Sequence, residues 1–181
     1  MFLYFIAIVL PEALDARILP LKYEMKEKYG CMVGLKSPAH ITLVPPFWME
    51  AEREGSLIAD TDHLSLRRPF KISTAGFSAF RPRTIFIDVA VSPELQAIKQ
   101  RAEELFTPAK GYKLKPENRP FHPHITIATR DLHKKAFAEA WEYFEKKEFE
   151  ITWEAMNVSV LRHNKKNWDV IHTSQFNTLS V

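Results

Sequence analysis

The sequence predicts an α+β fold of two similar lobes, each with an antiparallel-rich sheet and outer helices, and with a central cleft between them. The predicted elements run strand, helix, strand, short helix, two strands, helix, strand, helix and two strands, without a low-complexity segment or long linker. Both halves also contain a helix, a connecting loop and then a strand that carries His-x-Thr. A chain of 181 residues can bury a substantial core, so we expect one two-lobed domain over residues 1–181.

The chain begins with an apolar segment followed by an amphipathic one. Residues 2–10 are apolar and aromatic, which is typical of a strand covered on both faces. Residues 12–29 show apolar side chains at helical spacing up to Gly30, and we expect Pro20 to kink or divide this helix.

The next segments contain the first motif strand and a polar stretch. Residues 39–44 have the pattern of a strand, and we expect Pro45-Pro46 to end it because proline donates no hydrogen bond to a neighbouring strand. Residues 50–66 are polar with a weak helical period, which favours a short helix.

A hairpin and a helix follow in the middle of the chain. The segments 70–79 and 84–91 read as two strands around Arg81-Pro82-Arg83. Ser92 then supplies a helix cap with a proline in the first turn. The expected buried face of this helix consists of Leu95, Ile98, Ala102 and Leu105.

The last third of the chain should contain a loop, a strand, a helix and two strands. Residues 107–120 are rich in Pro and Lys, and the second motif strand is expected at 121–129. Residues 132–146 present Phe137, Trp141 and Phe144 on one helix face. The final strands are expected at 148–162 and 167–175, with a turn at 164–167.

Composition and charge exclude several classes of protein. The net charge of +3 suits an anionic substrate, but it falls well short of a strongly basic nucleic-acid scaffold. Cys31 is the single cysteine, so an internal disulfide and a cysteine-based zinc site are excluded, and a cytoplasmic location is expected. The apolar start has no basic residue before Arg17, which favours a buried strand over a signal peptide, and no apolar run reaches membrane-spanning length.

Two tetrapeptides carry the main functional signal, His40-Ile41-Thr42-Leu43 and His124-Ile125-Thr126-Ile127. Side chains alternate between the faces of a strand, so each His and its Thr should share the face opposite the apolar pair. Two imidazoles that face one cleft can supply a general base and a general acid. Chance would give about 0.4 His-x-Thr triplets in a chain with this content of His and Thr, so two on strand-like segments indicate a site.

Other interpretations of these residues remain open. The two motifs could be ordinary strands with satisfied polar side chains, and His122 with His124 on one strand face could bind a metal ion. The basic loop with Lys110, Lys113, Lys115 and Arg119 could attract RNA phosphates or simply be solvated.

The sequence resembles the two-histidine (2H) phosphoesterase superfamily, in its branch of 2′-5′ RNA ligases and RNA 2′,3′-cyclic phosphodiesterases. The matching segments lie in the family's order over about residues 2–130: Phe5-Ile6-Ala7-Ile8 with Pro11-Glu12, His40-Ile41-Thr42-Leu43, Arg83-Thr84-Ile85-Phe86-Ile87-Asp88-Val89, and Phe121-His122-Pro123-His124-Ile125-Thr126-Ile127. The paired His-x-Thr motifs are the specific part of the match.

The resemblance implies a two-lobed fold and a site without metal or cofactor that acts on 2′,3′-cyclic or 2′-5′ phosphodiesters. It implies that His40 and His124 are the catalytic pair and that Thr42 and Thr126 hold the phosphate. The sequence departs from the ligase branch at 44–47, where Val-Pro-Pro-Phe replaces an apolar-Leu-Gly turn. It departs again after the second motif, because the expected Arg comes one residue late.

We therefore expect a phosphodiesterase of RNA ends or small nucleotides, possessing reversible chemistry that could also join RNA ends. The alternative is a catalytically retired domain that binds RNA or nucleotides in the same cleft. No protein partner is expected, and the chain should be a monomer. Candidate substrate contacts beyond the motifs are Arg130, Arg81, Phe86 and Tyr112, with Arg83, Arg162 and His163 as further phosphate contacts. Phe47, Trp48 and Phe86 could instead belong to the core.

Overall fold

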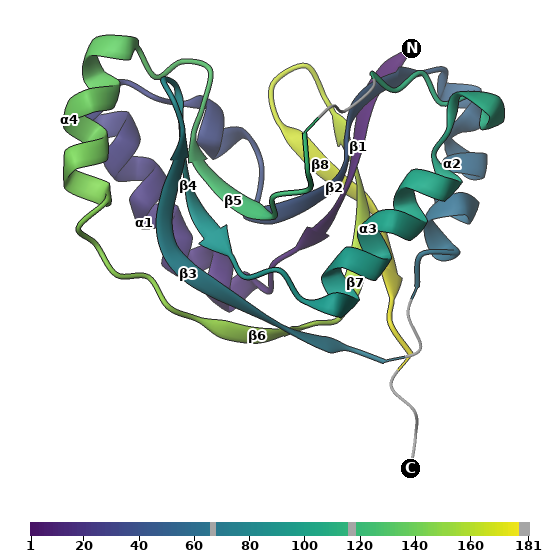
Figure 1. Ribbon diagram of the computed structural model, residues 1–181. Helices are drawn as coiled ribbons and strands as arrows, with labels where there is room; N and C mark the ends of the chain where they lie inside the picture. The colour runs from purple at the N-terminus through teal and green to yellow at the C-terminus, as the bar shows by residue number, and fades with distance from the viewer. Residues whose placement is uncertain (66–67, 116–118, 178–181) are drawn as a thin grey trace.

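Two four-stranded antiparallel sheets form the frame of the protein (Figure 1). The computed structural model describes residues 1–65, 68–115 and 119–177. The first sheet has the order β2-β1-β7-β8, with β1 (Phe2–Val9), β2 (His40–Met49), β7 (Asn157–His163) and β8 (Trp168–Gln175). The second has the order β5-β4-β3-β6, with β3 (Phe70–Phe80), β4 (Thr84–Val89), β5 (His124–Ala128) and β6 (Thr152–Ala155).

Helices connect the strands and cover the outer faces of the sheets. The α-helices of the described residues are α1 (Glu12–Tyr29), α2 (Glu54–Asp62), α3 (Pro93–Leu105) and α4 (Lys134–Phe144). Short 3₁₀ helices are η1 (Val33–Lys36), η2 (Ala51–Arg53) and η3 (Pro108–Lys110). None of the helices in the described part of the chain has the length and apolar character needed to span a bilayer.

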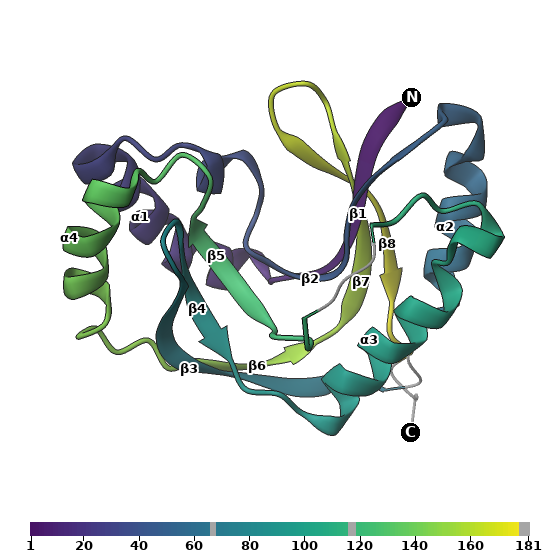
Figure 2. The ribbon, with the colours of Figure 1, turned by 45° about the horizontal axis from the view of Figure 1, so that its top comes forward.

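The two sheets repeat one arrangement around the motif strands. In each sheet the motif strand, β2 or β5, is an edge strand, and it pairs with the strand that begins the same unit, β1 or β4. The units β1-α1-β2 and β4-α3-β5 therefore correspond, as the repeated sequence pattern predicts. The two motif strands also contact each other, and Figure 2 shows them beside the space between the sheets.

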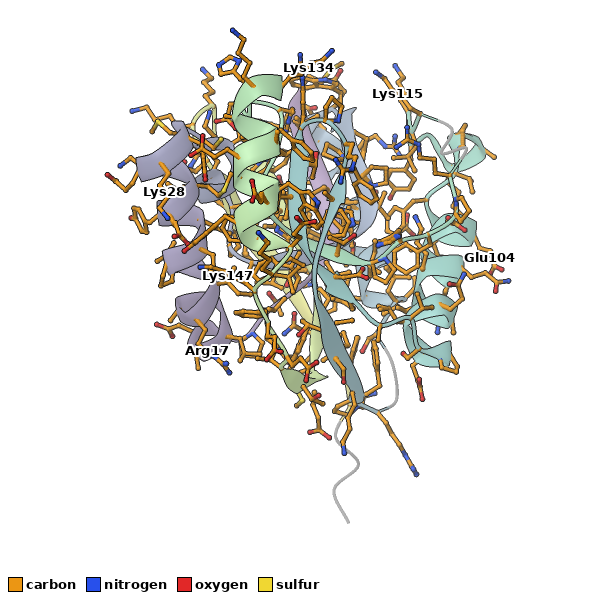
Figure 3. All side chains as sticks on the ribbon, turned by 60° about the vertical axis from the view of Figure 1, so that its left-hand side comes forward. Arg17, Lys28, Glu104, Lys115, Lys134 and Lys147 are labelled. Atoms are coloured by element: carbon orange, nitrogen blue, oxygen red, sulfur yellow. The ribbon has the colours of Figure 1, made fainter. Side chains whose placement is uncertain are left out.

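The long helices pack partly against the opposite half of the molecule. Helix α1 follows β1 but contacts β5 and α4, whereas α3 follows β4 but contacts β2. A polar cluster joins α1 to α4, because Glu24 accepts hydrogen bonds from Tyr143, Lys28 and Lys147. Lys28 and Lys147 lie on this side of the molecule, around α1 and α4 (Figure 3). This exchange of helices ties the two lobes together.

The core lies between the sheets and their outer helices. One buried apolar cluster contains residues of both sheets, for example Ile6 and Ile8 of β1 and Ile85 and Ile87 of β4. A second, small cluster on the other face of the first sheet includes Phe5 with Trp168 packed against it. One face of the first sheet therefore packs against helices in the core, and the other face carries the small cluster around Phe5.

Several local predictions agree with the structure. The segments around Arg81-Pro82-Arg83 form an antiparallel hairpin, and Ser92 caps α3 by accepting a hydrogen bond from the Leu95 amide at 3.1 Å. Helix α4 buries Phe137 and Phe144. Residue 66, the last of the weakly helical segment, and residues 116–118 of the basic loop lie outside the described residues.

Prolines interrupt the elements less than the sequence predicts. Helix α1 continues through Pro20, so the expected division of this helix is wrong. Strand β2 does not end at Pro45-Pro46 but runs on to Met49, with a change of register against β1 between Val44 and Phe47. Prolines fit at this place because β2 is an edge strand and the irregular pairing needs fewer donors.

The predicted strand 148–162 is also wrong as a single element. Its residues form β6 in the second sheet and β7 in the first, separated by Met156. The segment therefore crosses from one sheet to the other. Burial alternates along β6 but is continuous over residues 158–161 of β7, so the two parts also differ in how they are covered.

Candidate active site

The two motifs occupy equivalent positions on the inner faces of the two sheets. Ile41 and Ile125 are fully buried, whereas each His and Thr is partly exposed on the opposite strand face. His40 lies opposite Val9 of β1, and His124 lies opposite Asp88 of β4. The predicted alternation of faces is confirmed for both strands.

The imidazole of His40 is held by its own backbone and by an aromatic neighbour. Its Nδ1 lies 2.7 Å from the carbonyl oxygen of Pro38, and its ring lies 4.8 Å from that of Phe5. A carbonyl oxygen can only accept, so Nδ1 carries a hydrogen in every protonation state. Nε2 is therefore the nitrogen of His40 that gains or loses a proton.

His124 repeats this arrangement in the second sheet. Its Nδ1 lies 2.7 Å from the carbonyl oxygen of His122, again two residues before the histidine. Its ring packs against Phe86 and Phe80, with centroids 4.8 and 5.1 Å away. Nε2 of His124 is then also the nitrogen that exchanges a proton. The same tautomer is fixed at both motifs by the same local geometry.

Burial and nearby charge keep the His40 imidazole neutral. Desolvation is the main reason that the pKa of His40 falls from 6.5 to about 4, and the hydrogen bond to Pro38 opposes this shift. The positive charges of Lys22 and His124 lower the pKa of His40 further, whereas Asp15 raises it. A positive charge on His124 therefore disfavours the imidazolium form of His40, and His40 is neutral near pH 7.

A small polar cavity of about 180 Å³ lies at His40. Its polar side chains come from both motifs and from the segments around them: Ser37, His40, Thr42, Thr126, Thr129 and Arg130. Its apolar wall includes Phe5, Pro46 and Trp168. Four hydroxyls and one guanidinium around so small a space suit an anion such as phosphate.

A larger cavity of about 590 Å³ lies at His124. Phe80, Phe121 and Pro45 supply apolar surface there, and Arg119 and Lys99 supply positive charge. Thr42 lines this cavity as well as the small one. The two cavities thus meet at the first motif, with one motif histidine in each.

An unusual backbone conformation brings Arg130 to the small cavity. Strand β5 ends at Ala128, and Arg130 has a φ of 49°, in the left-handed region that non-glycine residues rarely adopt. Alternation along an ideal strand would direct Arg130 and Thr129 to opposite sides. Because the strand has ended, both residues line the same cavity.

Three of the candidate substrate contacts line neither cavity: Tyr112, Phe86 and Arg81. Tyr112 is 1% exposed, packs against Phe47 and Phe106, and donates its hydroxyl hydrogen to Asp60 at 2.6 Å, so it cannot stack on a base. Phe86 is fully buried beneath His124 and supports that ring.

Arg81 is turned away from both cavities. Its guanidinium lies 5.7 Å from the ring centroid of Phe137 and 5.9 Å from that of Trp141, over α4. The hairpin tip therefore contacts a helix, and the candidate role of Arg81 is not supported by its position. Arg83 of the same tip is exposed and lines neither cavity.

The remaining basic candidates have mixed positions. Arg162 pairs with Glu54 at 2.8 Å, and His163 packs against Trp168, so neither reaches the cavities. In the basic loop, Arg119 reaches the larger cavity, while Lys115 lies at the surface on the side away from α4 (Figure 3). Phe47 belongs to the core, whereas Trp48 is exposed.

The neighbouring His122 has its own carboxylate partner. Its Nε2 lies 2.8 Å from Asp88 Oδ1, and its ring contacts Phe80 and Phe86. Among residues 1–65, 68–115 and 119–177, no group of three or more His, Cys, Asp or Glu side chains is arranged to hold a metal ion.

Several residues of the site carry no signal in the sequence. Trp168 comes from the far end of the chain, and Lys99 comes from a helix whose apolar period suggests only packing. Phe121 and Ser37 flank the motifs, so proximity in sequence could have indicated them. Thr129 stands at the position where the resemblance implies an arginine.

Comparison with protein families identifies the chain. The model of the 2′-5′ RNA ligase superfamily matches residues 10–167. The protein belongs to this superfamily of 2H phosphoesterases. The match covers both motif strands and begins directly after β1. A comparison with curated protein sequences gave no match.

Solved structures show the same fold for this 2H phosphoesterase. TT0787 of Thermus thermophilus superposes with a TM-score of 0.68 at 20% identity, covering 99% of this chain and 100% of that one. LigT of E. coli in complex with 3′-AMP gives 0.67 at 16% identity, covering 97% and 98%. A structure described as a phosphoesterase gives 0.60 at 15% identity, covering 97% and 98%.

Proposed function

We propose that this protein is a metal-independent phosphodiesterase that hydrolyses 2′,3′-cyclic or 2′-5′ linkages of RNA ends or small nucleotides. One observation carries the proposal: two histidines with the same fixed tautomer lie at two cavities that meet at Thr42. Membership of the superfamily supports a phosphodiesterase type of reaction. LigT, which shares the fold, was solved with 3′-AMP and with ATP, in line with a nucleotide ligand here.

In the proposed chemistry His40 is the general base and His124 is the general acid. Neutral His40 takes a proton from water at Nε2 while the water oxygen bonds to phosphorus. Protonated His124 gives its Nε2 proton to the ribose oxygen as the phosphorus–oxygen bond to ribose breaks. The product is a phosphomonoester, and a proton must pass back from His40 to His124, through solvent, before the next turnover. Each imidazole can contribute about 10²–10⁴-fold to the rate.

The side chains around the small cavity suit the charge that develops on the phosphoryl group. Thr42 and Thr126 would donate hydrogen bonds to its non-bridging oxygens, and Arg130 would balance its negative charge. Threonine is suited to this role because its branched side chain limits rotation on a strand.

The unequal cavities suggest how a nucleotide binds. The phosphate fits the small cavity at His40, and the nucleoside fits the larger cavity, with Phe80 and Phe121 beside the base and Arg119 near its edge. This orientation places the leaving ribose oxygen on the side of His124, consistent with its proposed role as the acid.

Turnover in EDTA tests the proposal directly. We expect the wild type to hydrolyse 2′,3′-cyclic AMP and a 2′-5′-linked dinucleotide in EDTA, and to leave a 3′-5′-linked dinucleotide intact. Product analysis by chromatography would show which ester bond breaks. Binding without turnover would favour a retired nucleotide-binding domain instead. Activity that EDTA removes would favour a metal-dependent hydrolase.

The pH dependence of kcat/KM should be bell-shaped with an unusually low acid limb. Because the pKa of His40 is about 4, the base stays neutral, and kcat/KM should fall only below about pH 5. On the alkaline side it should fall as the acid loses its proton. A decline that already begins between pH 7 and 6 on the acid side would contradict the assignment of His40 as the base.

The same shift predicts the direction of an effect on stability. The folded state binds a proton at His40 less readily than the unfolded chain, whose histidine titrates near 6.5. This group therefore makes the free energy of unfolding decrease as pH falls from about 6.5 to about 4. Circular dichroism at each pH should accompany the rate measurements, so that unfolding is not mistaken for protonation of the base.

A further inference from the structure

A buried lysine lies behind the small cavity, and the proposed chemistry does not use it. The side chain of Lys22, on α1, is 2% exposed, and its ammonium donates a hydrogen bond to the carbonyl oxygen of Ser37 at 2.9 Å. Ser37 itself lines the cavity. Burying an ammonium is costly, so a lysine in this position calls for a role beyond filling space.

Lys22 is one of two α1 side chains that hold the segment before His40. Asp15 accepts a hydrogen bond from the Ala39 amide at 2.7 Å, on the other side of Pro38 from the Lys22 contact. Asp15 and Lys22 are seven residues apart, which places them on the same face of the helix. Between the two contacts lies the Pro38 carbonyl that accepts the Nδ1 hydrogen of His40. Helix α1 therefore fixes the backbone that orients the imidazole.

The charge of Lys22 acts on the same imidazole. The charged groups that act on His40 are Lys22 and Asp15 from α1 and His124 from β5, and Arg130 after β5 lines the same cavity. Lys22 and His124 lower the pKa of His40, and Asp15 raises it. Burial lowers the pKa of Lys22 itself to about 8, so this ammonium remains mostly charged at neutral pH.

We propose that Lys22 is a positioning residue for His40, which orients the imidazole through the segment 37–39 and whose buried positive charge adds to burial in keeping the imidazole neutral. The expected effect of Lys22 on the rate of turnover rests on the proposed function. Its effect on the proton equilibrium of His40 does not depend on any activity. The arrangement gives α1 a role in the site, although this helix contributes no side chain to the cavity wall among the described residues.

Two variants separate the charge of Lys22 from its packing. Lys22→Met keeps an unbranched side chain but removes the ammonium, and Lys22→Arg keeps a positive charge. The pKa of His40 is followed by NMR titration of histidine-labelled protein, with the signal assigned by its loss in His40→Asn. We expect Lys22→Met to raise the pKa of His40 by about 1, and Lys22→Arg to leave it nearly unchanged. The NMR signal of His172, which lies on β8 and hydrogen-bonds Asp62, serves as the internal reference.

The acid limb of kcat/KM should follow the NMR result. In Lys22→Met it should move to higher pH by the same amount as the pKa of His40. An unchanged His40 titration in folded Lys22→Met would overturn the proposal, and so would an equal shift in both variants. If the wild type has no turnover, the proposed function fails, while the titration still decides the role of Lys22.

Asp15→Asn provides a second test in case Lys22→Met does not fold. Removing this carboxylate takes away a charge that favours the imidazolium, so the pKa of His40 should decrease. A change in the opposite direction, or no change, would contradict the electrostatic part of the proposal. The opposite signs expected for Asp15→Asn and Lys22→Met exclude a general loosening of the site as the common cause.

Discussion

Replacing either motif histidine by asparagine should lower kcat/KM for a 2′,3′-cyclic nucleotide by about 10³-fold or more, within the range expected for removal of a general acid or base. Asparagine can still donate a hydrogen bond to the carbonyl that holds Nδ1, so His40→Asn and His124→Asn keep the local structure. They lose the group that transfers the proton. The double variant should be little worse than either single one, because the two histidines act in one step.

A distant histidine and melting curves provide the controls for these variants. His63 lies at the end of α2, outside both cavities, so His63→Asn should retain the wild-type rate. Melting curves would confirm that each variant is folded. His40→Asn should also lose the acid limb of the pH profile and keep the alkaline one. More than a tenth of the wild-type activity in either motif variant would contradict two-histidine catalysis.

Gly34→Ala should destabilise the protein by about 2–3 kcal/mol, a typical cost of overpacking. A Cβ at Gly34 would lie 2.3 Å from the carbonyl oxygen of Ile127 and 3.1 Å from its carbonyl carbon. Ile127 belongs to the second motif strand, whose neighbouring residues Thr126 and Ala128 pair with β4, so the clash involves backbone that the sheet holds in place. Asp131 strengthens the same contact by accepting hydrogen bonds from the amides of Met32 and Val33 at 2.6 and 2.9 Å.

This contact joins the segment before the first motif to the second motif. An added methyl group would push η1 away from β5 and disturb the relative placement of the two histidines. We therefore expect a decrease in melting temperature of roughly 5–10 °C together with a lower kcat. Differential scanning calorimetry and the cyclic nucleotide assay would measure the two effects.

Gly55→Ala is the matched control for this substitution. Gly55 lies in α2, has no atom within 4 Å of an added Cβ, and does not adopt a positive φ. Alanine should stabilise this position by about 0.5–1 kcal/mol through the unfolded chain. If Gly34→Ala melted at the same temperature as Gly55→Ala, the result would contradict a destabilising clash between η1 and β5.

Local patterns in the sequence were sufficient for the motif strands and most helices. Alternation predicted that His40 and Thr42 share one face with Ile41 on the other, and the same holds for the second motif. The Ser92 cap was equally readable, because a cap involves residues only three apart. These features depend on backbone geometry within a few residues.

Other features required contacts between distant segments. The continuation of β2 through Pro45-Pro46 depends on its being an edge strand, and the division of 148–162 depends on which sheet each part joins. Tyr112 was predicted as a substrate contact but is buried, because Phe47 and Phe106 surround it. Periodicity carries no information about partners so far away in the sequence.

The sequence by itself determined the four motif residues, the faces they occupy and the family to which the chain is similar. Only the tertiary structure decided that Arg130 lines the cavity through a left-handed turn, and that Lys22 lies buried behind His40. The physical reason is the range of each effect. Side-chain direction along a strand follows from the backbone of neighbouring residues, whereas burial and the charge around an imidazole are set by elements that meet only after folding.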